Sequence, residues 1–315
     1  MPDIAALPIR EAEANWQEIA SKGYAVQPFA SPSELDALKD LYAATIAQVP
    51  REFFLSIFLE SIEAKRMIFE GVRSILHEKL TELVPCFRIV NASFVTKKAS
   101  TEHGGVGLHH DTSLVDHSQH LGINIWVPLC DVDPSNGCLR MADYSHRFNP
   151  ISFLPDGYHS GFEQELAPPY VTDIPMKAGE ACVFDSRLMH ASGQNRSDHE
   201  RVAVLFSLVP KDEPIRLHFR NPNSPERLDA YYVDSEFFLR FNPRVYPDES
   251  LRASMTFLGS FEYTPRKLSM ADFAELHPDI PWAPPDPPAS EEIPLPTSLW
   301  KGLLASLRSR KSQPK

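Results

Sequence analysis

The sequence has only four cysteines among its 315 residues, at positions 86, 130, 138 and 182. None of them forms a CxxC pair, and four thiols are too few to cross-link a chain of this length. We therefore expect reduced, buried cysteine side chains, and neither disulfides nor a zinc site.

The sequence also lacks long apolar runs and an excess of positive charge. No run approaches the roughly 18 apolar residues of a membrane span, and the first residues lack the basic end and apolar stretch of a secretory signal, so we expect a cytoplasmic protein. The 31 basic and 42 acidic side chains give a formal net charge of −11. Because nucleic-acid-binding proteins need basic surfaces, this charge argues against nucleic acid and favours a small-molecule or carrier-bound substrate.

Apolar periodicity divides the chain into a helical part and a β-rich part. Apolar residues recur at three- and four-residue intervals over 13–24, 33–46 and 61–84, with Ser33 as the expected N-cap of the second helix. One short strand is expected at 23–29, between the first two helices, and from residue 87 short β-rich runs separated by Gly, Pro, Asn and Asp follow at 87–95, 123–129, 138–142, 180–186 and 201–209. We expect a mainly β fold with flanking helices: a double-stranded β-helix (jelly roll, cupin-like) core at about 87–220, with the N-terminal helices packed outside.

The C-terminal residues have a different composition. Seven prolines fall between residues 281 and 296, and an amphipathic pattern with basic residues follows them. We expect a single domain over residues 1–260 and a proline-rich arm with a short helix over 261–315. The helix would dock on its own barrel or on the partner in a homodimer, with a membrane surface or another protein as alternatives.

Four of the twelve histidines lie in the stretch GLHHDTSLVDHSQH, residues 107–120. If the stretch is extended, His109 and Asp111 share one face and His110 points the other way. Two histidines and one carboxylate hold iron in non-haem ferrous oxygenases, so a third ligand is needed downstream. The candidates are the later histidines at 117, 120, 146, 159, 190, 199, 218 and 277.

His190 is the candidate with the most suitable surroundings. It follows a strand-like run and precedes a polar turn, which places it near the mouth of a jelly roll. Arg201, eleven residues later, begins the next strand-like run, and a guanidinium inside a barrel needs an anion such as the far carboxylate of a dicarboxylate co-substrate.

His109-x-Asp111, the stretch INIWVPLCDVDPSNGCLRMADYSHRF and the segment from His190 to Arg201 together resemble the phytanoyl-CoA dioxygenase family of Fe(II)- and 2-oxoglutarate-dependent oxygenases, over about residues 87–209. The resemblance implies that His109, Asp111 and His190 bind the iron and that Arg201 pairs with the distal carboxylate of 2-oxoglutarate.

The resemblance also implies further co-substrate contacts. Ser192 matches a contact to the same carboxylate, and Trp126 matches a tryptophan that lines the co-substrate side of the pocket. Either Ser93 or Asn91, which alternate onto one face of a strand, supplies another contact, and Lys97 occupies the place of a frequent lysine at the end of that strand.

The activity implied is a dioxygenase reaction with O2 as co-substrate. An unactivated C–H bond would be hydroxylated, or the substrate desaturated or cyclised, with release of succinate and CO2. Two alternatives remain: a cupin-like metal enzyme that does not use 2-oxoglutarate, and a non-catalytic barrel that binds a ligand. The loops at 112–121 and 149–170, with Arg66 and Met67 of the N-terminal helices, are the expected substrate surroundings; within the first loop, Asp116 and His117 either touch substrate or line a solvated loop.

Overall fold

A computed structural model of the chain describes residues 12–46, 49, 51–100, 104–148, 151–155, 158–159, 170–265 and 268–278. The chain divides into two units, residues 1–280 and 281–315, and none of the second is among the described residues. The predicted proline-rich segment and its amphipathic helix therefore lie outside the description. The predicted division at residue 260 stays a prediction.

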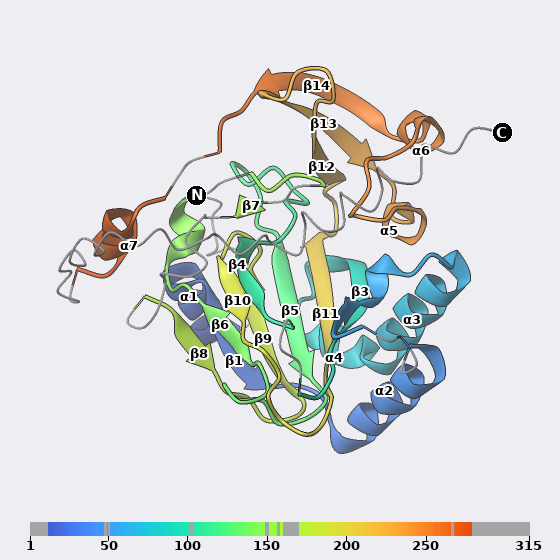
Figure 1. Cartoon of the computed structure of the whole chain (residues 1–315), viewed down its shortest axis with the longest axis vertical. Coiled ribbons are helices and arrows are strands. Elements are labelled where there is room, and N and C mark those ends of the chain that lie inside the picture. Colours follow the sequence, from blue (N-terminus) through green and yellow to red (C-terminus); the bar gives the residue numbers. More distant parts are fainter. Residues whose placement is uncertain are drawn as a thin grey trace. The chain divides into compact units, whose positions relative to one another are not determined.

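The larger of two facing sheets has six antiparallel strands in the order β1-β9-β5-β11-β3-β2 (Figure 1). Its strands are β1 (Tyr24–Pro28), β2 (Phe53–Leu55), β3 (Phe87–Lys97), β5 (Ile123–Pro128), β9 (Glu180–Asp185) and β11 (Arg201–Pro210). All six residues of β5 are buried, which explains its nearly continuous apolar sequence. The sheet extends beyond the region expected to form the core, because β1 and β2 come from the first 60 residues.

The smaller sheet has five antiparallel strands in the order β7-β4-β10-β6-β8. They are β4 (Val106–His110), β6 (Leu139–Met141), β7 (Tyr158–His159), β8 (Thr172–Ile174) and β10 (His190–Ser192). Trp126 and Cys182 of the large sheet pack with Leu139 and Met141 of the small one in a single apolar cluster. This interior between two antiparallel sheets confirms the double-stranded β-helix.

Helices cover the outer face of the large sheet, as predicted. These are α1 (Ala12–Lys22), α2 (Pro32–Thr45), α3 (Ile62–Ile75) and α4 (His77–Leu83), of which α2 to α4 lie beside β3 and β11 in Figure 1. Leu38 of α2 and Val72 of α3 pack with Phe94 and Phe206, which alternate away from the barrel interior. The outer layer thus fixes which strand residues face inward.

The N-cap of α2 differs from the prediction. Ser31, not Ser33, caps the helix: its hydroxyl accepts a hydrogen bond from the backbone N–H of Glu34, and the Glu34 carboxylate accepts one from the backbone N–H of Ser31. Pro32 then occupies the first helical position, where its missing N–H costs nothing. The predicted cap, Ser33, therefore lies two residues beyond the true one.

A third sheet lies beyond the predicted core. It has the order β12-β13-β14, made of β12 (Ile215–Arg220), β13 (Arg227–Val233) and β14 (Thr256–Glu262), with α5 (Phe237–Arg240) and α6 (Glu249–Ala253) between the last two. Leu217 and Phe219 of β12 pack against Leu114 and Val115, which belong to the loop after β4. They also pack against Leu154, which belongs to a second loop. The sheet therefore holds the loop that follows β4.

Three smaller observations complete the fold. Phe273 of α7 (Met270–Leu276) is buried behind the small sheet with Leu108. All four cysteines are free; Cys138 and Cys182 are buried as expected, but Cys86 is exposed, so the expectation of burial is wrong there. Within the described part of the chain, no helix has both the length and the apolar character needed to cross a membrane.

Candidate metal centre and co-substrate pocket

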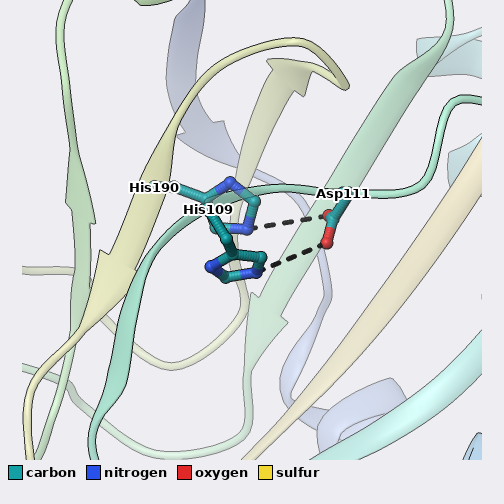
Figure 2. Close-up of side chains that lie close together, drawn as sticks. All are labelled: His109, Asp111 and His190. Atoms are coloured by element: carbon teal, nitrogen blue, oxygen red, sulfur yellow. Dashed lines mark ion pairs between the residues drawn. The ribbon is translucent and has the colours of Figure 1, made fainter. Parts of the chain in front are cut away.

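Two neighbouring strands of the small sheet bring together His109, Asp111 and His190. His190 begins β10 and is paired directly with His109 of β4, while Asp111 follows the last residue of β4. One ligand atom from each side chain lies within 4.8 Å of the others, and Figure 2 shows the three groups turned toward a common point. Within the described ranges, no other group of three or more His, Cys, Asp or Glu side chains could hold a metal ion.

Both imidazoles are oriented by backbone carbonyls two residues earlier in the chain. Nδ1 of His109 lies 2.8 Å from the carbonyl oxygen of Gly107, and Nδ1 of His190 lies 3.0 Å from that of Leu188. A carbonyl only accepts, so each Nδ1 carries the proton and each Nε2 keeps its lone pair. Both Nε2 atoms lie 3.6 Å from oxygens of Asp111, as the dashed lines in Figure 2 mark.

Burial keeps the imidazole of His190 uncharged. The side chain of His190 is 8% exposed, and burial lowers its pKa to about 4. Its ring packs against Phe184 of β9 at a centroid distance of 5.0 Å and against His109 at 4.4 Å. At neutral pH His190 is therefore a fixed neutral ring with a free lone pair, the form that binds a metal ion.

Asn124 of β5 holds the carboxylate from the opposite sheet. Its side-chain amide donates a hydrogen bond of 2.6 Å to Oδ2 of Asp111. Burial by itself would raise the pKa of Asp111, but His190 and His109 outweigh that effect and the pKa lies below its usual value. The sequence interpretation missed Asn124; its signal is a lone amide in an apolar strand, two residues before Trp126 and so on the same inward face.

Two basic side chains are buried side by side on the inward face of the large sheet. Arg201 of β11 is paired directly with Lys97 of β3, and the two residues are 1% and 0% exposed. Nε and Nη1 of Arg201 are buried without a hydrogen-bond partner among the described residues. Lys97 donates hydrogen bonds to the backbone carbonyls of Ser192 and Gly193. Since buried charges are normally paired, this arrangement requires an anion.

The predicted tryptophan and serine lie beside Arg201 and Lys97. The Cζ atom of Arg201 lies 5.4 Å from the ring centroid of Trp126, within range of a cation–π contact. Ser192 is buried in β10, two residues after His190, and its carbonyl accepts a 3.1 Å hydrogen bond from Lys97. The same two facing sheets therefore supply the residues around Arg201 and Lys97 and the residues of the metal centre.

Asn91 and Ser93 both belong to the inward face of β3. The Ser93 hydroxyl donates a 3.0 Å hydrogen bond to the side-chain oxygen of Asn91. Across the sheet, Ser93 is in register with Trp126 through Leu205, and Asn91 is in register with Asn124. The choice between them as a co-substrate contact stays open. Ser93 is aligned with Trp126, which lies beside Arg201, and Asn91 is aligned with Asn124, which bonds to Asp111.

Other expectations are met less well. Arg66 and Met67 lie on the exposed face of α3, outside the large sheet, and do not join the centre. Of the loop at 149–170, only 151–155, 158–159 and 170 are described, so the remaining residues of this predicted substrate loop lie outside the description. His110 directly follows His109 in β4, so its side chain lies on the opposite face of the strand, as predicted.

The donor set fits a ferrous ion. Two imidazole nitrogens and one carboxylate on one face match the ligand set of non-haem iron oxygenases, which leaves positions for a chelating co-substrate. The buried, unpaired guanidinium fits the far end of a dicarboxylate. The roles of the individual residues stay predictions.

Comparisons with known proteins give a family match and distant relatives. The sequence model of the family described as phytanoyl-CoA dioxygenase (PhyH) matches residues 13–203. The dioxygenase olcK of Penicillium canescens is 27% identical over 126 residues, 38% of each chain. A phytanoyl-CoA dioxygenase domain-containing protein 1 of Danio rerio is 23% identical over 181 residues, which cover 53% of this chain and 61% of that protein. The chain thus spans less than two thirds of the length of either curated relative.

Among solved structures, HygX of Streptomyces hygroscopicus, crystallised with nickel, 2-oxoglutarate and hygromycin B, aligns with a TM-score of 0.49 and 15% identity. The alignment covers 65% of this chain and 88% of HygX.

Proposed function

Because the chain belongs to the phytanoyl-CoA dioxygenase family, we propose that it is an Fe(II)- and 2-oxoglutarate-dependent dioxygenase acting on a small-molecule or carrier-bound substrate. The observation that carries the proposal is the convergence of three ligand atoms within 4.8 Å from two neighbouring strands. The unpaired Arg201 guanidinium supports the choice of a dicarboxylate co-substrate.

In this proposal His109, Asp111 and His190 hold the iron, and Asn124 fixes the rotation of the Asp111 carboxylate. When bound, Fe(II) with 2-oxoglutarate and O2 supplies the oxidation of an unactivated C–H bond to an alcohol, a double bond or a ring, while 2-oxoglutarate becomes succinate and CO2. Arg201 holds the distal carboxylate of 2-oxoglutarate, and Lys97 lies beside it on the neighbouring strand. Trp126 and the apolar interior exclude water, which strengthens the contact to Arg201.

An anaerobic titration with Fe(II) and 2-oxoglutarate tests the proposal. We expect the weak visible charge-transfer band of the chelate in the wild type and its loss in His190→Ala. The matched control is His199→Ala, which removes an exposed histidine paired with Asp198. Absence of the band in the wild type, or its persistence in His190→Ala, would refute the assignment.

Succinate release distinguishes the two alternatives. A cupin-like enzyme that does not use 2-oxoglutarate would turn over its substrate without forming succinate, and a binding module would form no product. A cytoplasmic location and a homodimer formed through the C-terminal arm are further parts of this proposal, to be tested by cell fractionation and by the mass of the protein in solution.

A further inference from the structure

The backbone just before His190 sets the orientation of its imidazole. Nδ1 of this ring donates a 3.0 Å hydrogen bond to the carbonyl oxygen of Leu188. Nε2 is therefore the nitrogen that remains for a metal ion, and Figure 2 shows it turned toward Asp111. The strand β10 has only three residues and begins at His190 itself. The position of the Leu188 carbonyl thus depends on what holds the segment before the strand.

Met189 joins this segment to the turn that follows β6. Its backbone N–H donates a 2.8 Å hydrogen bond to Oγ of Ser145, and its carbonyl accepts a 2.9 Å hydrogen bond from the N–H of Ala142. Ser145 and Met189 are both 0% exposed. Water therefore does not compete for the Ser145 hydroxyl, and the loss of this acceptor would leave a buried N–H unpaired.

The hydrogen bonds of Ser145 and His190 act on one rigid group. The carbonyl of Leu188 and the N–H of Met189 belong to the same peptide unit, which is planar. The Ser145 hydroxyl holds the N–H of this unit, and the His190 imidazole is held by its carbonyl. A rotation of the peptide plane would break both bonds, so the Ser145 hydroxyl controls the acceptor that orients the imidazole.

The turn that carries Ser145 is fixed against the end of α1. The carbonyl of Lys22, the last residue of α1, accepts a 2.9 Å hydrogen bond from the N–H of Tyr144. The carbonyl of Ser21 accepts one of 2.9 Å from Nη2 of Arg147. The last carbonyls of a helix have no partner within the helix, so these bonds complete α1 and hold the turn at the same time.

Tyr144 adopts an unfavourable backbone conformation in this turn. Its φ is 66°, in the left-handed region that large side chains rarely occupy. The ring of Tyr144 packs edge-on to the ring of His277 at a centroid distance of 5.1 Å, and the guanidinium of Arg147 lies 5.0 Å from its centroid. A strained conformation persists only where the surrounding contacts enforce it, so these ring contacts help to keep the turn in place.

The segment of α7 supplies contacts to this turn and to the back of β10. His277, which directly follows α7, is 8% exposed. Phe273 of α7 is fully buried and belongs to the same apolar cluster as Met189 and Ala191. These two residues flank His190, so their side chains lie on the opposite side of the chain from the metal centre.

We propose that Ser145 and Tyr144 are positioning residues for the metal centre. Ser145, held in its turn by Tyr144 and His277, fixes the peptide between residues 188 and 189 and with it the ring of His190. The proposal rests on the proposed function only in taking His190 as a metal ligand. Both residues act through His190, by keeping the proton on Nδ1 and the lone pair on Nε2.

NMR of the metal-free protein with ¹⁵N-labelled histidine tests the role of Ser145. In the wild type we expect His190 to be protonated at Nδ1 alone, and its signals are those missing in His190→Ala. In Ser145→Ala, the peptide loses its acceptor, and we expect a mixture of the two neutral tautomers. The affinity for Fe(II) alone, measured anaerobically, should fall about tenfold.

Ser56→Ala is the matched control. Ser56 is 2% exposed, and its Oγ accepts a 3.0 Å hydrogen bond from the backbone N–H of Phe94, far from His190 in the large sheet. Both variants lose a buried hydroxyl that accepts a backbone N–H, so both should lose a similar amount of stability. Only Ser145→Ala should change the His190 tautomer and the affinity for Fe(II).

Two variants of Tyr144 test the contact with His277. Tyr144→Gly accommodates the left-handed backbone without strain but removes the ring, so we expect the His190 tautomers to mix as in Ser145→Ala. Tyr144→Phe keeps the ring contact with His277 and should resemble the wild type. If circular dichroism shows that Ser145→Ala is unfolded, Tyr144→Gly takes its place.

The outcomes separate this proposal from the proposed function. A wild-type tautomer in Ser145→Ala, or an equal change in Ser56→Ala, would overturn the role of Ser145, and a wild-type tautomer in Tyr144→Gly would overturn that of Tyr144. Because the NMR measurement needs no iron, the expected tautomer change without the Fe(II)–2-oxoglutarate band would retain the positioning of His190 and reject the oxygenase. The band without the tautomer change would do the opposite.

Discussion

The side-chain amide of Asn124 donates a 2.6 Å hydrogen bond to Oδ2 of Asp111 across the interior of the barrel. It connects the large sheet to a proposed ligand that lies at the end of a strand in the small sheet. The hydrogen bond restricts rotation of the Asp111 carboxylate about its last torsion. The amide therefore decides which oxygen is presented to a metal ion.

Asn124→Ala is expected to weaken Fe(II) binding by about 10- to 100-fold, the usual effect of losing a partner that orients a metal ligand. Metal titration followed by the 2-oxoglutarate chelate band measures the change. Asn223→Ala, at an exposed position, is the matched control and should bind iron like the wild type. An unchanged iron affinity in Asn124→Ala would show that Asp111 needs no such support.

Arg201→Met is expected to change stability and co-substrate binding in opposite directions. Without 2-oxoglutarate, the variant should be more stable than the wild type by about 2 kcal/mol, because it removes a buried charge that has no acidic partner among the described residues. With saturating 2-oxoglutarate, only the wild type should gain stability. Chemical denaturation with and without the co-substrate measures both effects. Arg73→Met, at an exposed helical position, is the control, and a destabilised Arg201→Met would contradict the reasoning.

Lys97 should make stability depend on pH. Burial, followed by the charge of Arg201, lowers the pKa of Lys97 from 10.5 to about 6. Between these values the unfolded chain binds a proton that the folded protein does not, so the free energy of unfolding rises with pH, by at most about 1.4 kcal/mol per unit.

Relative to the wild type without 2-oxoglutarate, Lys97→Met should therefore be most favoured at pH 6 and below, and the difference should shrink steadily toward pH 9. Denaturation curves at several pH values measure it, with Lys39→Met as the exposed control. Parallel pH profiles for wild type and Lys97→Met would mean that Lys97 keeps its ordinary pKa.

The capping residue of α2 can be tested with two serines. Ser31→Ala should lower the free energy of unfolding by about 1 kcal/mol, because the first turn loses its side-chain acceptor. Ser33→Ala, inside the helix, should change it by less than about 0.5 kcal/mol, since surface substitutions away from caps have small effects. Neither should alter the chelate band. A larger loss for Ser33→Ala would restore the original sequence interpretation.

Local patterns were sufficient where the physical cause is local. Short β-rich runs predicted β1, β3, β5, β6, β9 and β11, and apolar residues at three- and four-residue intervals predicted the outer helices. The two-residue spacing of His109 and Asp111 predicted their shared face. The N-cap of α2 was misassigned although it is local, because both Ser31 and Ser33 are acceptable caps by residue type. Pro32 at the start of the helix and Glu34 three residues after Ser31 distinguish them.

Contacts between distant segments required the fold itself. The pairing of His190 with His109, the bond from Asn124 to Asp111 and the packing of β12 on the loop after β4 each depend on strand register, which a single sequence does not specify. The sequence by itself determined which residue types were available to bind a metal and an anion. The tertiary structure decided which of them meet, because hydrogen-bonded register sets the neighbours of every inward-facing side chain.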